Sequence, residues 1–223
     1  MRVIPDDDAG RAAAIAVLRE GGVVAFPTDT VYGIAVAPAI PNGVERLFHV
    51  KRRPADKGIA LLLADADQAG TVGLVDSRAR RLAARFWPGP LTLILPARTA
   101  VGNQGANTDG PATVGVRLPD HPTPRALAAA LGPLPTTSAN LSGQPDAVEA
   151  AEVVAMLGDR IDLVLDGGRT RGAIASTVVD LSVDPLVVRR EGPIGSARIL
   201  ALLGTAEPGD SSRNPGSSPG SSS

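Results

Sequence analysis

Four cationic side chains gather in one short segment of the sequence, residues 51–58 (KRRPADKG): Lys51, Arg52, Arg53 and Lys57. Pro54 ends a helix and biases the residue before it towards extended backbone, so the cations should spread around a loop. Such a spread of lysine and arginine suits a triphosphate, whose oxygens accept charge-assisted hydrogen bonds. The alternative is a solvated basic helix end that the helix dipole favours.

The lysine content gives this segment further weight. Lys51 and Lys57 are the only lysines among the 22 basic residues of the chain. Biased genome composition can replace lysine by arginine wherever any cation suffices. Two lysines that remain six positions apart then indicate a need for the compact ammonium group.

Two further segments are rich in hydroxyl groups. Residues 27–33 (PTDTVYG) follow a short apolar run, and open α/β sheets bind ligands where strands end. Thr28 and Thr30 alternate, so both hydroxyls can face one side and, with Tyr32, suit a small polar ligand such as an amino acid. Residues 136–143 (TTSANLSG) form a predicted loop that can present hydroxyl, amide and backbone donors. Each segment could instead be a turn or helix cap that satisfies its own backbone.

Two single residues complete the set of candidates. Arg117 stands at the end of an apolar run, where a buried or cleft-lining guanidinium needs an anionic partner. Trp87, the only tryptophan, is more typical of core packing.

Composition excludes other kinds of chemistry. The 223 residues include no cysteine and two histidines, which excludes disulfides, thiolate metal sites and a cysteine nucleophile. Residues 1–206 contain no GxxxxGK[ST], GxGxxG or Gly-x-Ser-x-Gly pattern. The net charge of −1 does not favour a general attraction to nucleic acid. Without a run of about 18 apolar residues or a signal-peptide pattern, a cytoplasmic protein with no membrane span is expected.

The elements that must position these residues alternate between helical and strand patterns. Helices are expected over residues 11–20, 44–50, 77–86, 122–131, 147–157 and 194–203. Strands are expected over residues 23–26, 59–63, 91–95, 113–117, 161–165, 177–181 and 186–189, the last two as a hairpin. Apolar strands between helices predict an α/β fold, and strands that follow strands predict a mixed sheet.

One domain over residues 1–206 is the simplest organisation, because no repeat or linker interrupts it. Residues 207–223 are rich in serine, glycine and proline and are expected to form a disordered tail. Residues 102–110 (GNQGANTDG) are expected to form a mobile lid, on their glycine content.

Taken together, these segments resemble the YrdC-like family, the threonylcarbamoyl-AMP synthases. The similarity runs in order over about residues 12–195: PTDTVYG, Lys-x-Arg-Pro-x-x-Lys, FWPGPLT, VRxPxHP, the Ser-x-Asn loop, STVVDL and an arginine before x-Gly-x-Ile. The resemblance implies a twisted, mixed open sheet covered by helices, with a concave basic cleft and in a single-domain form. It also implies that L-threonine, bicarbonate and ATP are converted to L-threonylcarbamoyl-AMP and pyrophosphate for tRNA modification.

The same resemblance implies a role for each matching residue. The implied catalytic residues are Lys51 and Arg53. The implied ATP-binding residues are Arg53, Lys57, Thr113, Ser138, Asn140, Ser142 and Arg190. The implied threonine-binding residues are Thr28, Thr30, Arg117, Thr136 and Ser176. No zinc and no organic cofactor are implied, Mg²⁺ would be carried by the ATP phosphates, and the partner would be a downstream threonylcarbamoyl-transferase complex.

The sequence departs from the family pattern at the threonine end, where Gly58 and Leu62 replace the proline and histidine of some relatives. One alternative is a non-catalytic relative that binds double-stranded RNA or tRNA on its concave face, although aromatic residues are only 2% of the chain. Another is the carbamoyl-transfer module of hydrogenase maturation, which normally sits in a much larger chain.

Overall fold

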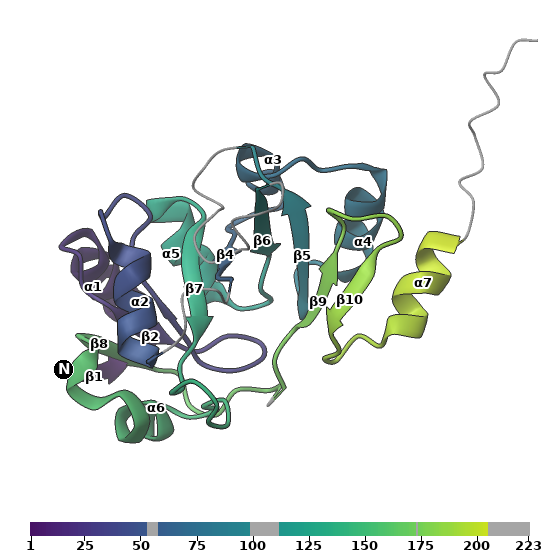
Figure 1. Ribbon diagram of the computed structural model, residues 1–223. Coiled ribbons are helices and arrows are strands. Elements are labelled where there is room, and N and C mark those ends of the chain that lie inside the picture. Colours follow the sequence, from purple (N-terminus) through teal and green to yellow (C-terminus); the bar gives the residue numbers. More distant parts are fainter. Residues whose placement is uncertain (53–57, 99–111, 173, 205–223) are drawn as a thin grey trace, which may run out of the picture.

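The computed structural model describes residues 1–52, 58–98, 112–172 and 174–204. A ten-stranded twisted sheet runs through this part of the chain in the order β1-β8-β2-β3-β7-β4-β6-β5-β9-β10 (Figure 1). The strands are β1 (Arg2–Pro5), β2 (Val24–Phe26), β3 (Gly33–Ala35), β4 (Ala60–Leu62), β5 (Leu91–Pro96), β6 (Thr113–Arg117), β7 (Leu134–Ser138), β8 (Leu163–Asp166), β9 (Thr177–Asp180) and β10 (Val187–Arg190).

The sheet is mixed, as the sequence predicts. Strand β8 is parallel to β1 and β2, β4 is parallel to β6, and β5 is parallel to β9. The pairs β2–β3, β3–β7, β4–β7, β5–β6 and β9–β10 are antiparallel. The predicted hairpin at the end of the chain is therefore confirmed as β9–β10.

Helices cover the two halves of the sheet differently. Helices α1 (Asp8–Arg19) and α5 (Pro122–Leu131) share a buried cluster with one face of β2, β3 and β8, and α2 (Gly43–Lys51) and α6 (Ala150–Leu157) pack on the other face. In the second half, α4 (Ser77–Phe86) and α7 (Ser196–Gly204) pack behind β5, β6 and β9, near the short α3 (Ala69–Val72).

Side-chain alternation along β5 and β6 explains how these strands contribute to the core on one face of the sheet and to a cavity on the other. On β5, the residues Leu91, Leu93 and Leu95 are buried against α4 and α7, whereas Thr92 and Ile94 line a cavity on the opposite face. Strand β6 repeats the pattern: its valines are buried, and Thr113, Gly115 and Arg117 line the same cavity. The period of two along each strand thus separates core from site.

Local sequence signals fix the helix starts. The carboxylate of Asp7 accepts a hydrogen bond from the Gly10 backbone N–H at 2.7 Å, and Asp76 accepts one from Ala79 at 2.8 Å. Both are side-chain caps that satisfy otherwise unpaired amide groups. None of the helices in the described ranges is long and apolar enough to cross a membrane.

The sequence-based assignment is wrong for residues 136–138. They were expected in a loop, but they form the end of β7, a central strand hydrogen-bonded to both β3 and β4. Thr136 and Thr137 are β-branched and suit a strand, and the pairing partners lie far away in the sequence. Strands β1 and β3 and helix α3 were also not predicted, and α6 begins at Ala150 instead of residue 147.

Candidate active site

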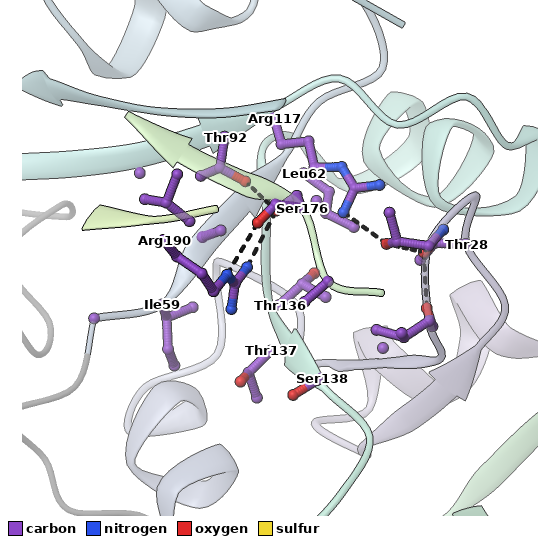
Figure 2. A pocket seen from close by; sticks show the side chains of 18 of the residues that line it. Thr28, Ile59, Leu62, Thr92, Arg117, Thr136, Thr137, Ser138, Ser176 and Arg190 are labelled. Atoms are coloured by element: carbon purple, nitrogen blue, oxygen red, sulfur yellow. Dashed lines mark hydrogen bonds between the residues drawn. The ribbon is translucent and has the colours of Figure 1, made fainter. Parts of the chain in front are cut away.

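A cavity of about 500 Å³ opens on the face of the sheet opposite α4 and α7. This volume falls within the roughly 300–1,000 Å³ of small-molecule sites. Eight of the residues predicted from the sequence line it: Thr28, Thr30, Thr113, Arg117, Thr136, Ser138, Ser176 and Arg190. Figure 2 shows several of these side chains converging from different strands.

Strand register gives the cavity two ends. Leu62 on β4 pairs with Arg117 on β6. Two residues earlier in both strands, Ala60 pairs with Gly115. On the other side of β4, Ala60 also pairs with Thr136. One end of the floor therefore carries Leu62 and Arg117, and we call it the Arg117 end. The opposite end carries Thr113 and Ser138, the terminal residues of β6 and β7, and we call it the Ser138 end.

Arg117 is buried and held by three contacts from separate segments. Its Nη2 donates to Asp29 Oδ1 at 2.6 Å, its Nη1 to Thr30 Oγ1 at 2.9 Å, and its Nε to the Gly89 carbonyl at 3.1 Å. Burial lowers the pKa of Arg117, and the neighbouring Asp29 carboxylate offsets part of that effect. Asp29 is thus the anionic partner that the sequence required without identifying it.

The hydroxyls of Thr28 and Thr30 form a directed chain. Thr28 donates to the Val31 carbonyl at 2.7 Å, so in the contact of 3.0 Å between the two hydroxyls Thr30 must be the donor. Thr30 Oγ1 also accepts from Arg117, which leaves it one lone pair as an acceptor for a ligand N–H or O–H group. The segment is therefore a turn that satisfies its own hydrogen bonds and also lines the cavity, while its contact with a ligand stays a prediction.

The phenol of Tyr32 is bound to backbone. Its hydroxyl donates to the Gly168 carbonyl at 2.8 Å and accepts from the Gly167 amide at 3.2 Å. Burial raises the pKa of Tyr32 to about 12. The hydroxyl therefore orders the segment around residue 168; Tyr32 also lines the cavity beside Thr28 and Thr30, and its contact with a ligand stays a prediction.

Lys51 is the last residue of α2 and is almost fully buried, with 1% of its surface exposed. Its ammonium donates to the Ser138 carbonyl, to Ser138 Oγ at 3.3 Å and to Asn140 Oδ1 at 2.7 Å. The Ser142 amide donates to the Lys51 carbonyl at 2.9 Å. The lysine expected to fan out around a loop thus lies beneath the Ser138 end and fixes residues 138–142.

Other sequence-based expectations concern segments outside the described ranges. Arg53 and Lys57 lie there, as do the expected lid over residues 102–110 and the expected tail over residues 207–223. Gly58 and Leu62, the two departures from the family pattern, both line the cavity.

Ser176, Thr92 and Arg190 form a hydrogen-bonded group on the cavity wall (Figure 2). Thr92 Oγ1 and Ser176 Oγ are 2.8 Å apart, and Arg190 donates to the Ser176 carbonyl at 2.9 Å and to Ser176 Oγ at 3.3 Å. Burial lowers the pKa of Arg190, and Asp146 counteracts this. No role was predicted for Thr92; a single hydroxyl inside an apolar strand facing this cavity was the signal available for it.

No group of three or more histidine, aspartate or glutamate side chains that could hold a metal ion occurs within the described residues. The cavity instead offers arginine side chains and a set of hydroxyls, which suit an anionic, hydroxyl-bearing ligand. The fold and the site therefore define an α/β protein with an open-sheet cavity whose lining suits small anionic molecules.

Comparisons with known proteins place the chain in a family. The Sua5_yciO_yrdC family model, described as Telomere recombination, matches residues 16–192. A threonylcarbamoyl-AMP synthase of Bacillus subtilis is 40% identical over 195 residues, which are 86% of this chain and 56% of that protein. One from Idiomarina loihiensis is 40% identical over 171 residues, 74% of this chain and 88% of that protein.

A solved structure agrees with these relatives. The crystal structure of Pyrococcus abyssi Sua5 complexed with L-threonine superimposes with a TM-score of 0.84 at 35% identity, covering 92% of this chain and 61% of that one. The chain belongs to the Sua5/YciO/YrdC family. It spans 56% of the length of the Bacillus subtilis relative, little more than half.

Proposed function

We propose that this protein is an L-threonylcarbamoyl-AMP synthase, which joins L-threonine, bicarbonate and ATP and releases pyrophosphate. Two observations support the proposal. Relatives at 40% identity carry that name, and a relative with the same fold was crystallised with L-threonine. The observation that carries it furthest in this chain is the register of the cavity floor, because the implied threonine ligand Arg117 and the implied ATP ligands Thr113 and Ser138 occupy opposite ends.

At the Arg117 end, we propose that the guanidinium binds the threonine carboxylate. A guanidinium has five N–H groups. Asp29, Thr30 and Gly89 each accept from one, so these three contacts leave one N–H on Nη1 and one on Nη2 for a ligand. The lone pair of Thr30 suits the amine or hydroxyl of the substrate. Leu62, the register partner of Arg117, supplies an apolar surface for the substrate methyl group, a contact worth roughly 1–3 kcal/mol in selectivity over serine. Thr28, Thr136 and Ser176 complete this proposed subsite.

We propose that Thr113 and Ser138 at the Ser138 end contact the nucleotide, together with Arg190 on the cavity wall, and that Asn140 and Ser142 shape the segment that follows Ser138. The buried ammonium of Lys51 lies directly beneath Ser138 and adds positive charge there. Arg53 and Lys57 are proposed to bind the triphosphate of MgATP, a role that rests on the family resemblance.

The proposed reaction needs no protein nucleophile. The threonine amine and bicarbonate form a carbamate with loss of water, and a carbamate oxygen attacks the α-phosphorus of MgATP. The new P–O bond forms as the bond to the β-phosphate bridging oxygen breaks, and pyrophosphate leaves with the electron pair. Fixed cations and donors stabilise the negative charge that builds on the phosphoryl oxygens, each worth roughly 10²–10³ in rate. Holding three small reactants together supplies much of the remaining rate enhancement.

The product is a mixed anhydride, an activated acyl group. We propose that a downstream transferase complex passes its threonylcarbamoyl group to an adenosine of tRNA, and that the protein acts in the cytoplasm, where ATP and tRNA are found.

Incubation of the full chain with L-threonine, MgATP and ¹³C-bicarbonate, followed by mass spectrometry, tests the proposal. We expect threonylcarbamoyl-AMP one mass unit heavier than the unlabelled product. Absence of the product with all three reactants present would exclude synthase activity. Salt-sensitive binding of double-stranded RNA by the same inactive preparation would then support the non-catalytic alternative.

A further inference from the structure

Thr92 is the only residue of β5 (LTLILP) that carries a hydroxyl group. Its side chain is buried and lines the cavity, where Oγ1 lies 2.8 Å from Ser176 Oγ. Among the described residues, Ser176 is the one hydrogen-bond partner of this hydroxyl. A lone polar group in an apolar strand, directed at a single serine, indicates a specific use of that contact.

Proton accounting shows what Thr92 does to Ser176. A serine hydroxyl has one proton and two lone pairs, and one lone pair of Ser176 Oγ accepts from Arg190 Nη2 at 3.3 Å. When Thr92 donates to the second lone pair, the Ser176 proton remains for a ligand in the cavity. When Ser176 donates instead, the Thr92 proton remains for the ligand, so in either direction the contact fixes the rotamer of Ser176 and leaves one hydroxyl proton of the pair for a ligand.

Ser176 is also tied to the residue proposed to contact the nucleotide. Arg190 donates to both the carbonyl and the hydroxyl of Ser176 (Figure 2). The Ser176 hydroxyl is therefore hydrogen-bonded to both Thr92 and Arg190. Hydrogen bonds in such a chain polarise one another, so each strengthens the next.

The surrounding backbone shows that the contact between Ser176 and Arg190 is built into the fold. The fully buried hydroxyl of Thr177 donates to the Ile194 carbonyl at 2.8 Å and accepts from the Gly192 amide at 3.0 Å. Gly192 packs so closely that a Cβ atom would lie 2.3 Å from the Ala175 carbonyl oxygen. The segment that follows Arg190 is thus hydrogen-bonded to Thr177 and packed against Ala175, the two residues that flank Ser176.

We propose that Thr92 is a positioning residue, and that its hydrogen bond to Ser176 makes the binding of L-threonine and ATP cooperative. This inference rests on the proposed function, because it takes the amino acid and the nucleotide as the two ligands. Thr92 acts through Ser176.

Isothermal titration of L-threonine into the full chain, with and without saturating Mg²⁺ and α,β-methylene-ATP, measures the coupling without turnover. In the wild type, the analogue should raise threonine affinity by about fivefold or more. Thr92→Val keeps the shape but removes the hydroxyl, and the gain should fall below about twofold. Thr92→Ser restores the hydroxyl and should restore the coupling. Thr71→Val, at an exposed threonine bound to its own helix turn, is the matched control.

A double-mutant cycle separates this role from general packing. If Thr92 acts through Ser176, Thr92→Val should change nothing further in a Ser176→Ala background. If Thr92→Val does not fold by circular dichroism, Thr92→Ser should keep the coupling and Ser176→Ala should lose it.

Three results overturn the inference. They are full coupling in Thr92→Val, full coupling in Ser176→Ala, and equal threonine affinity with and without the analogue in the wild type. The last result leaves the proposed function standing, because both ligands still bind. A wild-type protein that binds neither ligand overturns the proposed function and the inference together.

Discussion

Arg117 Nη2 and Asp29 Oδ1 lie 2.6 Å apart, and their side chains are only 8% and 11% exposed. This ion pair joins the loop after β2 to the end of β6. It also sets the direction of the guanidinium, whose remaining N–H groups are available to the cavity. The stability of this region and the proposed binding of threonine therefore depend on the same contact.

Replacement of Asp29 by alanine leaves the buried charge of Arg117 without its partner. We expect a loss of about 3–5 kcal/mol in the free energy of unfolding, with a higher KM for threonine. Asp29→Asn keeps an acceptor for the guanidinium and should lose less. Urea unfolding measures both variants, and Asp8→Ala, which breaks an exposed pair with Arg11, should change little. A wild-type unfolding curve for Asp29→Ala would contradict this role.

Lys51→Ala removes the buried ammonium beneath the Ser138 end. The burial of Lys51 also predicts a stability loss of about 1–3 kcal/mol, because its acceptors are left unpaired. Pyrophosphate release should fall by roughly 10²–10³-fold. Arg52→Ala, at the exposed neighbouring cation, is the control. Activity within a few fold of wild type for Lys51→Ala would show that this charge is dispensable.

Gly192→Ala tests the close packing behind Arg190. The added Cβ atom would lie 2.3 Å from the Ala175 carbonyl oxygen, so the segment must shift and move Arg190 away from Ser176. We expect kcat/KM for ATP to fall by roughly 10- to 100-fold, as for other displacements of about 1 Å. Gly195→Ala is a matched control, because open space surrounds that position. Equal kinetics for the two variants would contradict the proposed placement of Arg190.

The raised pKa of Tyr32 predicts a pH dependence of stability. Its folded pKa of about 12 exceeds the ordinary tyrosine value of about 10, so its contribution to stability is complete below pH 10 and is lost as pH rises towards 12. Tyr32→Phe removes this titration and should be less stable than wild type at pH 7 by about 1 kcal/mol, from the lost hydrogen bonds. Urea unfolding at pH 7, 9, 10 and 11 should show the difference shrinking above pH 10. A constant difference would mean that the hydroxyl titrates normally.

The sequence predicts helices and strands best where their ends carry local signals. Residues 77–86 and 122–131 match α4 and α5 in full, since Asp76 caps the first and His121 with Pro122 begins the second. Strand β7 was missed because its threonines read as a polar loop. Its identity depends on pairing with β3 and β4, whose residues are distant in the chain.

In the candidate site too, local patterns were predictable from the sequence, whereas contacts between distant residues were not. Motifs identified Thr30, Arg117 and Ser176 as residues of the cavity, but not the partners that orient them, Asp29 and Thr92. Spacing along one strand reveals which face a side chain occupies. A contact between two strands depends on the topology, which the sequence pattern left open.

Pyrophosphate release from MgATP, with L-threonine and bicarbonate each added and then omitted, tests the proposed synthase activity most directly. The wild-type protein should release pyrophosphate only when all three reactants are present, because the carbamate of threonine is the proposed nucleophile. Release that is independent of threonine or bicarbonate, or ATP that stays intact in the complete mixture, would contradict the assignment.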